Sequence, residues 1–232
     1  MNLFIKKIFI YSILFHFCFS QKIIIPMDNS QNDHLKAYGL VYFMLNKNNN
    51  VEWLLNYKGG SFLLDYQDIL FKEAKLRGIT LSNINASDLN NIFQEIDDKN
   101  MDIVLLEKAP KIAVYSPKDK QPWDDAVTLA LTYAEIHYDV IFDQEVLIGE
   151  LSQYDWLHLH HEDFTGQYGK FYKSFRNSSW YKKMENDFQK IAFNLGFNSV
   201  QNLKKNVAKK IKDYIINGGF IFAMCSETDS FD

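Results

Sequence analysis

The sequence has few cysteines, prolines and glycines, and its basic residues are outnumbered by acidic ones. Two cysteines in 232 residues cannot form a disulfide framework, and four prolines with ten glycines exclude a collagen-like or low-complexity chain. The net charge of −4 lacks the excess of basic residues that is typical of nucleic-acid-binding proteins. Hydrophobic residues make up 47% of the chain, so one large or two small cores are possible. We expect a folded globular protein.

Residues 1–20 have the layout of a secretory signal peptide. Lys6 and Lys7 form a positive segment, and a mainly apolar stretch follows over residues 8–19. Cys18 and Ser20 are small residues before a cleavage point at Gln21. After residue 20 no apolar run approaches the ~20 residues of a transmembrane helix. We expect export to the periplasm, the cell surface or the medium, without an integral membrane segment after cleavage.

Short β-rich runs alternate with helical periods in the rest of the chain. This alternation predicts an α/β fold with a mostly parallel sheet and helices on both faces. Ala109-Pro110 breaks the pattern and predicts either two domains or two halves of one sheet: an N-terminal α/β region over 21–109 and a second region over 110–232. Strands are predicted over residues 22–27, 51–57, 79–84, 101–106, 111–115, 140–142, 156–160 and 220–225. Helices are predicted over residues 32–45, 66–77, 87–97, 124–137, 179–195 and 199–216.

The last predicted strand ends at Cys225, and the acidic residues after Ser226 resemble the start of another helix. A parallel sheet that ends on a strand without its covering helix would expose apolar surface. We therefore expect the region over 110–232 to be incomplete at its C-terminus.

Cys225 is the first candidate for chemistry, because it ends an apolar strand that runs into a predicted turn. Ligands of open α/β sheets bind beyond the carboxyl ends of the strands. A thiol at such a turn lies near amide donors, which lower its pKa and favour a nucleophile. A buried small side chain that closes the strand is the alternative interpretation.

The second candidate is the polar run of three histidines and two acids at the end of the strand over 156–160. Strand alternation predicts that His158, His160 and Glu162 share one face, with His161 and Asp163 on the other. The first three could bind zinc or another divalent metal, although the spacing matches no zinc signature and no metal is assigned. Two structural interpretations of this run also remain open: a solvated strand end, and histidines that hydrogen-bond a neighbouring loop. Glycines that would let the next loop approach a ligand follow at Gly166 and Gly169.

Two other patterns favour ordinary structural roles. Lys58-Gly59-Gly60 lacks the spacing of a phosphate-binding loop and predicts a plain turn. The lysines of the helix over 199–216, Lys204 among them, are interpreted as its solvated side, opposite an apolar face that includes Val207 and Ile211. The aromatic residues over 168–181 are expected to pack or to line a cleft.

The order of elements after residue 110 resembles the flavodoxin-like fold of class I glutamine amidotransferases. The matching stretches are KIAVYSP, DDAVTLALTYAEI, YDVIFD, YDWLHLHHED and VAKKIKDYIINGGFIFAMC. The resemblance implies that Cys225 stands at the nucleophile elbow. In active members the elbow reads Gly-x-Cys-x-Gly, whereas this chain has Ala223 and Glu227 at the glycine positions.

Residues 22–232 are also similar to a family of exported bacterial proteins named asparagine synthetase B, most specifically in HLHHEDFTGQYGKF and AMCSETDSFD. Glutamine-dependent asparagine synthetases use an N-terminal cysteine, whereas Asn2 follows Met1 here, and we do not expect asparagine synthesis.

Three functions therefore stay open. The first is Cys225-dependent amide hydrolysis or transfer, with oxyanion donors near residues 166–169. The second is a non-catalytic α/β module that binds a small-molecule, sugar or cell-envelope ligand through its histidines and aromatic side chains. The third is a metal-binding module over residues 158–163.

Overall fold

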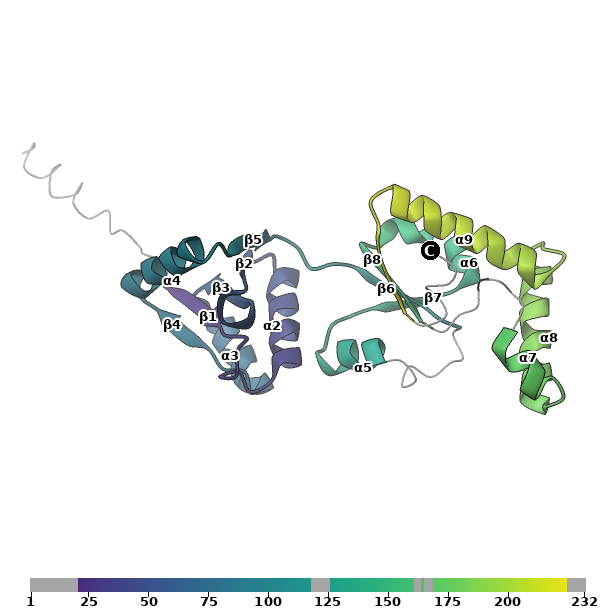
Figure 1. Cartoon of the computed structure of the whole chain (residues 1–232), viewed down its shortest axis with the longest axis horizontal. Helices are drawn as coiled ribbons and strands as arrows, with labels where there is room; N and C mark the ends of the chain where they lie inside the picture. Colours follow the sequence, from purple (N-terminus) through teal and green to yellow (C-terminus); the bar gives the residue numbers. More distant parts are fainter. Residues whose placement is uncertain (1–20, 118–125, 161–163, 165–168, 225–232) are drawn as a thin grey trace, which may run out of the picture. The chain divides into compact units, whose positions relative to one another are not determined.

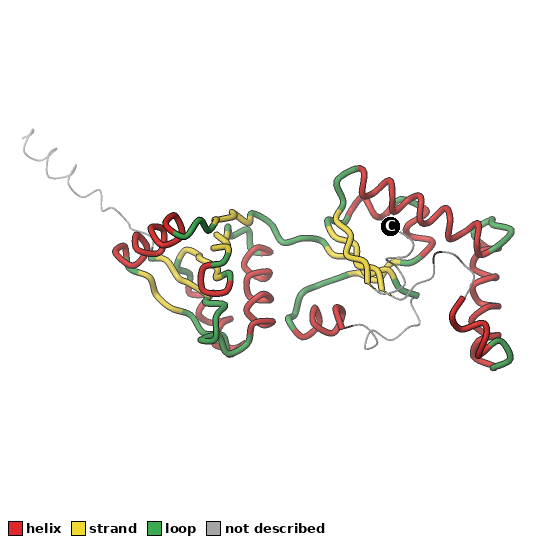
Figure 2. The backbone as a smooth tube through the Cα atoms, viewed as in Figure 1, coloured by secondary structure: helices red, strands yellow, loops and turns green. Residues whose placement is uncertain are grey.

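The structure is a computed structural model that describes residues 21–117, 126–160, 164 and 169–224. The chain divides into two compact units with the boundary between Ala109 and Pro110. Both units combine strands with helices, which makes the protein an α/β protein (Figures 1 and 2).

The N-terminal unit contains a five-stranded sheet in the order β4-β1-β3-β2-β5. Neighbouring strands are antiparallel throughout. Alternate residues of β1 face two cores: Ile23 and Ile25 pack with α2 and α3, while Ile24 packs with α4. The elements are β1 (Lys22–Ile25), α2 (His34–Asn46), β2 (Val51–Leu55), η1 (Tyr57–Gly59), β3 (Ser61–Asp65), α3 (Asp68–Arg77), β4 (Ser82–Ile84), α4 (Ala86–Asp98) and β5 (Asp102–Leu106).

The antiparallel sheet corrects the expectation of a mostly parallel sheet for this part of the chain. Residues 56–60 alone connect β2 to β3, and a parallel crossover needs a dozen or more residues. Gly59 and Gly60 have φ of 79° and 88°, which lets the chain reverse there. The turn was predicted but no strand was predicted after it, so the hairpin was missed.

The C-terminal unit contains a four-stranded sheet in the order β7-β6-β8-β9, and all its strand pairs are parallel. A parallel sheet was expected for this region, and the structure confirms it. The elements are β6 (Ile112–Tyr115), α5 (Ala126–Tyr133), β7 (Asp139–Ile141), α6 (Asp143–Leu147), η3 (Glu150–Gln153), β8 (Trp156–His160), α7 (Gly169–Phe175), α8 (Ser179–Asn194), α9 (Val200–Ile216) and β9 (Phe220–Met224).

Helix α9 covers one face of this sheet and supplies much of its core. It begins at a Ser199 cap, whose hydroxyl accepts a hydrogen bond from the Asn202 backbone N–H at 3.2 Å. It ends before Gly218, whose φ of 96° suits a glycine. Its buried residues form a stripe at helical spacing and pack against Leu157 and Leu159 of β8.

Candidate functional site

The four parallel strands of the C-terminal unit end at one common edge. Tyr115 of β6 pairs with both Ile141 of β7 and Leu159 of β8, and His160 of β8 pairs with Met224 of β9. Ligands of open α/β folds bind beyond the carboxyl edge of the sheet. The edge is therefore the candidate site that the fold itself provides.

Part of the predicted site lies in the described structure. His160 is the last residue of β8, and Gly169 is the first residue of α7. The other residues proposed for this edge lie outside the described residues: Cys225, His161, Glu162, Asp163 and Gly166.

His158 lies within the sheet, two residues before the end of β8. Its side chain is fully buried, and the ring stacks on Phe222 of β9 with 5.7 Å between centroids. Nδ1 is 3.2 Å from the backbone oxygen of Phe222, which can only accept, so this nitrogen carries the proton. His158 was predicted to share a strand face with His160, and this stays a prediction; in the structure the His158 ring packs against Phe222. Among the described residues no three potential metal-ligating side chains form a cluster.

A buried ionic cluster stands directly behind the carboxyl edge, and the sequence analysis did not predict it. Lys204 of α9 donates hydrogen bonds from Nζ to the Tyr115 hydroxyl at 2.9 Å and to Asp143 Oδ1 at 3.0 Å. The Tyr115 hydroxyl also donates to Asp143. Lys204 is 2% exposed and Asp143 is 0% exposed. Because both charges are out of water, each depends on the other for compensation.

The Lys204 ammonium is also enclosed by aromatic rings. Its Nζ lies 4.3 Å from the ring centroid of Phe142 and 5.2 Å from that of Phe188. The rings of Tyr115 and Phe164 lie at 5.3 Å and 5.8 Å. The negative faces of such rings attract a cation, and the attraction strengthens when water is excluded.

The ionic cluster connects the elements that form the edge. Tyr115 ends β6, Asp143 begins α6 just after β7, and Phe164 lies in the connection that follows β8. Asp143 Oδ2 is buried and has no hydrogen-bond partner among the described residues. This arrangement fixes the ends of the strands against α9 with one charge network.

The expectation that Lys204 belongs to the solvated side of its helix was wrong. The buried positions of α9 are Val200, Leu203, Lys204, Val207, Ile211 and Tyr214. Lys204 lies within this stripe, four residues after Val200, three before Val207 and seven before Ile211. A lysine at a core position of an amphipathic helix was the signal in the sequence, and its acidic partner follows the strand β7.

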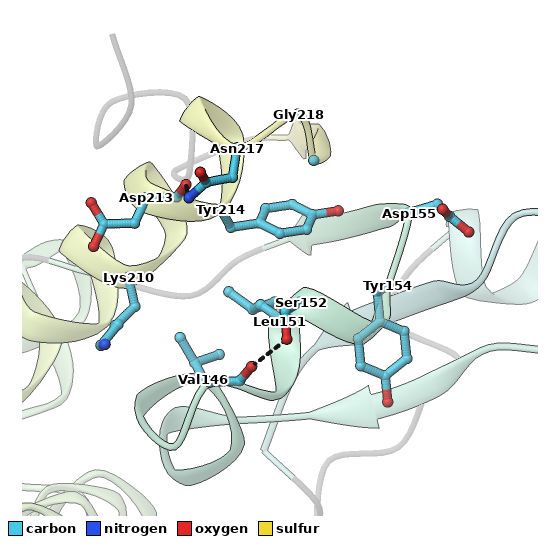
Figure 3. Close-up of a pocket in the computed structure, with 12 residues that line it drawn as sticks. Val146, Leu151, Ser152, Tyr154, Asp155, Lys210, Asp213, Tyr214, Asn217 and Gly218 are labelled. Atoms are coloured by element: carbon cyan, nitrogen blue, oxygen red, sulfur yellow. Dashed lines mark hydrogen bonds between the residues drawn. The ribbon is translucent and has the colours of Figure 1, made fainter.

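A separate pocket of about 440 Å³ lies at the opposite end of the strands (Figure 3). Tyr154 and Asp155 precede β8, and Gly218 and Gly219 precede β9, so this pocket is remote from the carboxyl edge. The Tyr214 ring extends from α9 into it, and its hydroxyl donates to the backbone oxygen of Phe220 at 3.3 Å.

The polar groups of this pocket hold its wall together. Ser152 donates to the Gly149 oxygen at 2.9 Å, and Asn217 donates to the Asp213 oxygen at 2.8 Å. Burial raises the pKa of Tyr154, and the carboxylate of Asp139 raises it further. The tyrosine hydroxyl therefore stays protonated at neutral pH. This lining lacks an activated nucleophile among the described residues.

Comparison of the chain with models of protein families, with curated proteins and with solved structures finds no match. Of the helices in the described part of the chain, none has the length and apolar character needed to cross a membrane.

Proposed function

We propose that the chain is an exported protein whose C-terminal unit hydrolyses or transfers an amide group at the carboxyl edge of its parallel sheet, with Cys225 as the nucleophile. The register of β8 and β9 carries the proposal. His160 pairs with Met224, so the two strands end level, and the sequence continues from them to His161 and Cys225. The amidotransferase-like resemblance assigns the nucleophile to the same position.

The reaction follows the chemistry of a cysteine nucleophile. The Cys225 thiolate attacks the carbonyl carbon of the amide, a C–S bond forms, and the carbonyl electron pair moves to oxygen. Collapse of this intermediate breaks the C–N bond, and the amine leaves with a proton from a general acid. Water, or an acceptor amine in a transfer, then displaces the thiol from the thioester. We assign proton transfer to the imidazole of His160 or His161.

The ionic cluster supports this site without contacting the substrate. A nucleophile, its base and the oxyanion donors have to stay within a fraction of an ångström of their working positions. The hydrogen bonds among Lys204, Asp143 and Tyr115 tie β6 and α6 to α9. The proposal therefore treats Lys204 as a positioning residue.

Thiol labelling tests the proposal, because Cys225 is the only cysteine once residues 1–20 are removed. The folded chain without these residues is treated with iodoacetamide between about pH 5 and pH 9, and the mass shift is followed over time. We expect fast alkylation with an apparent pKa below the ~8.5 of a free cysteine. Cys225→Ser gives the background, and His160→Gln is expected to slow labelling near neutral pH.

Labelling that appears only after denaturation would refute the nucleophile. The carboxyl edge would then remain as the binding surface of a non-catalytic module, and ligand binding there would survive Cys225→Ser. Rapid labelling justifies a screen of amide and ester substrates, in which Cys225→Ser has to abolish turnover.

A further inference from the structure

A second cavity of the C-terminal unit, about 470 Å³ in volume, lies on its helical side. Helix α8 supplies one wall with residues spaced four apart: Tyr181, Glu185, Gln189 and Phe193. Because residues at i and i+4 share a helix face, this stripe faces a single ligand space. The other lining residues are Tyr172 of α7, Phe197, Asn198 and Ser199 of the α8–α9 connection, and Val200 and Gln201 of α9.

The lining combines aromatic rings with neutral hydrogen-bonding groups. Phe193 is 80% exposed and Tyr172 is 51% exposed, so both present ring surface to solvent. These two rings line the cavity, so a ligand that enters it can pack against their exposed surface. The Arg176 guanidinium lies 5.7 Å from the Tyr172 ring centroid, so one face of that ring is already occupied.

The polar side chains of the cavity determine the class of ligand. Gln189, Asn198 and Gln201 carry amides, whose nitrogens donate and whose oxygens accept hydrogen bonds. The Asn198 oxygen already accepts a hydrogen bond from Asn202 Nδ2 at 2.5 Å. Glu185 accepts when ionised, and none of the ten described lining residues is basic. A ligand with many hydroxyl groups, which also donate and accept, matches this set. An anionic ligand fits less well, since Glu185 is the one charged residue among the described lining residues and the neighbouring Arg176 guanidinium lies over the Tyr172 ring.

We propose that this cavity binds a neutral oligosaccharide. The apolar C–H face of a sugar ring packs on the exposed aromatic rings, while its hydroxyl groups hydrogen-bond to the amides and to Glu185. The volume lies within the range of about 300–1,000 Å³ that is usual for ligand pockets. The Tyr181 ring is buried and contacts the exposed Tyr172 ring edge-on, with 6.4 Å between centroids. Sugar binding in this cavity does not depend on Cys225 or on the carboxyl edge.

Binding of defined sugars tests the proposal. Chitohexaose, cellohexaose and maltohexaose are titrated at millimolar concentration into the full chain without residues 1–20, by calorimetry and by tryptophan fluorescence. Trp180 contacts the Tyr181 ring edge-on, with 5.8 Å between centroids, and its fluorescence is expected to report changes at the cavity. We expect at least one of the three to bind.

Two variants place the binding in the cavity. Phe193→Ala removes an exposed ring that the core does not need, and we expect the affinity to fall about tenfold, equivalent to ~1.4 kcal/mol. Gln189→Ala should weaken binding by a similar factor. Lys190→Ala, beside Gln189 and 75% exposed, is the matched control and should leave the affinity unchanged.

The proposal is overturned if none of the three sugars binds, or if Phe193→Ala and Gln189→Ala bind as tightly as the unmodified chain. Binding of an aromatic peptide with no sugar binding would assign the cavity to a protein partner and would equally overturn it. Because Cys225→Ser is expected to bind sugar normally, failure here is distinguishable from failure of the proposed amide chemistry.

Discussion

Replacement of Lys204 by methionine removes a buried charge and keeps most of the side-chain length. In the folded protein the Lys204 ammonium is the cation that compensates Asp143, and it donates to both Asp143 and Tyr115. In the Lys204→Met variant the Asp143 carboxylate stays buried with the Tyr115 hydroxyl as its remaining donor among the described residues. Breaking a buried pair in this way costs about 3–5 kcal/mol. The four rings around Nζ also lose a cation, worth ~0.5–2 kcal/mol in such environments.

The adjacent Lys205 provides the control. It lies on the same helix with its side chain exposed, so Lys205→Met should change the free energy of unfolding by less than about 0.5 kcal/mol. Urea unfolding of the signal-free chain gives this free energy. Hydrogen exchange then shows whether α9 and β6 lose protection while the N-terminal unit keeps it.

A double-mutant cycle separates the ion pair from simple packing. Asp143→Asn removes the charge of the partner and leaves an acceptor for Tyr115. We expect the loss in the double variant to be smaller than the sum of the two single losses by about 0.5–3 kcal/mol. If Lys204→Met is no worse than Lys205→Met, or if the two losses simply add, Lys204 and Asp143 are not coupled as the structure indicates.

Two more predictions concern backbone geometry and pH. Gly59→Ala should destabilise the N-terminal unit more than Gly78→Ala: φ is positive at both, but only at Gly59 would a Cβ collide with the carbonyl oxygen of Met27. Equal urea midpoints for the two would contradict this. Burial raises the pKa of Tyr57 and Tyr214 in the folded protein above the value of about 10 that a tyrosine has in the unfolded chain. The stability that this contributes is therefore fully present below the pKa of the unfolded state and is lost as the pH rises through the pKa of the folded state. Tyr214→Phe should lose ~1 kcal/mol of stability at neutral pH. Above about pH 10 its melting temperature should fall less with each further rise in pH than that of the parent, because the variant lacks the titrating hydroxyl.

Local signals placed the strands and the two longest helices of the C-terminal unit, whereas the short helices α6 and α7 were missed. The strand predicted over 156–160 coincides with β8, and the helix predicted over 199–216 differs from α9 by one residue. A serine cap at one end and a glycine with positive φ after the other are local features that a sequence shows directly. Strand β3 was missed because its first four residues, from Ser61, are buried without the alternation that marks a half-buried strand.

The sequence predicted where a site would lie, and that location stays a prediction. The end of a parallel strand is a local property, and the sequence alone pointed to His160 and to the residue after Met224. The ionic cluster behind that edge depends on contacts across 61 and 89 positions of the chain, from Lys204 to Asp143 and to Tyr115. Hydrophobic periodicity assigns every lysine to the water-facing side of a helix, because it considers only the polarity of each residue. It does not consider whether an acidic partner from another part of the chain lies nearby. A lysine inside an apolar stripe is better interpreted as a buried cation that needs a buried acidic residue as its partner. The residues at the ends of neighbouring strands are then where that acid should be sought.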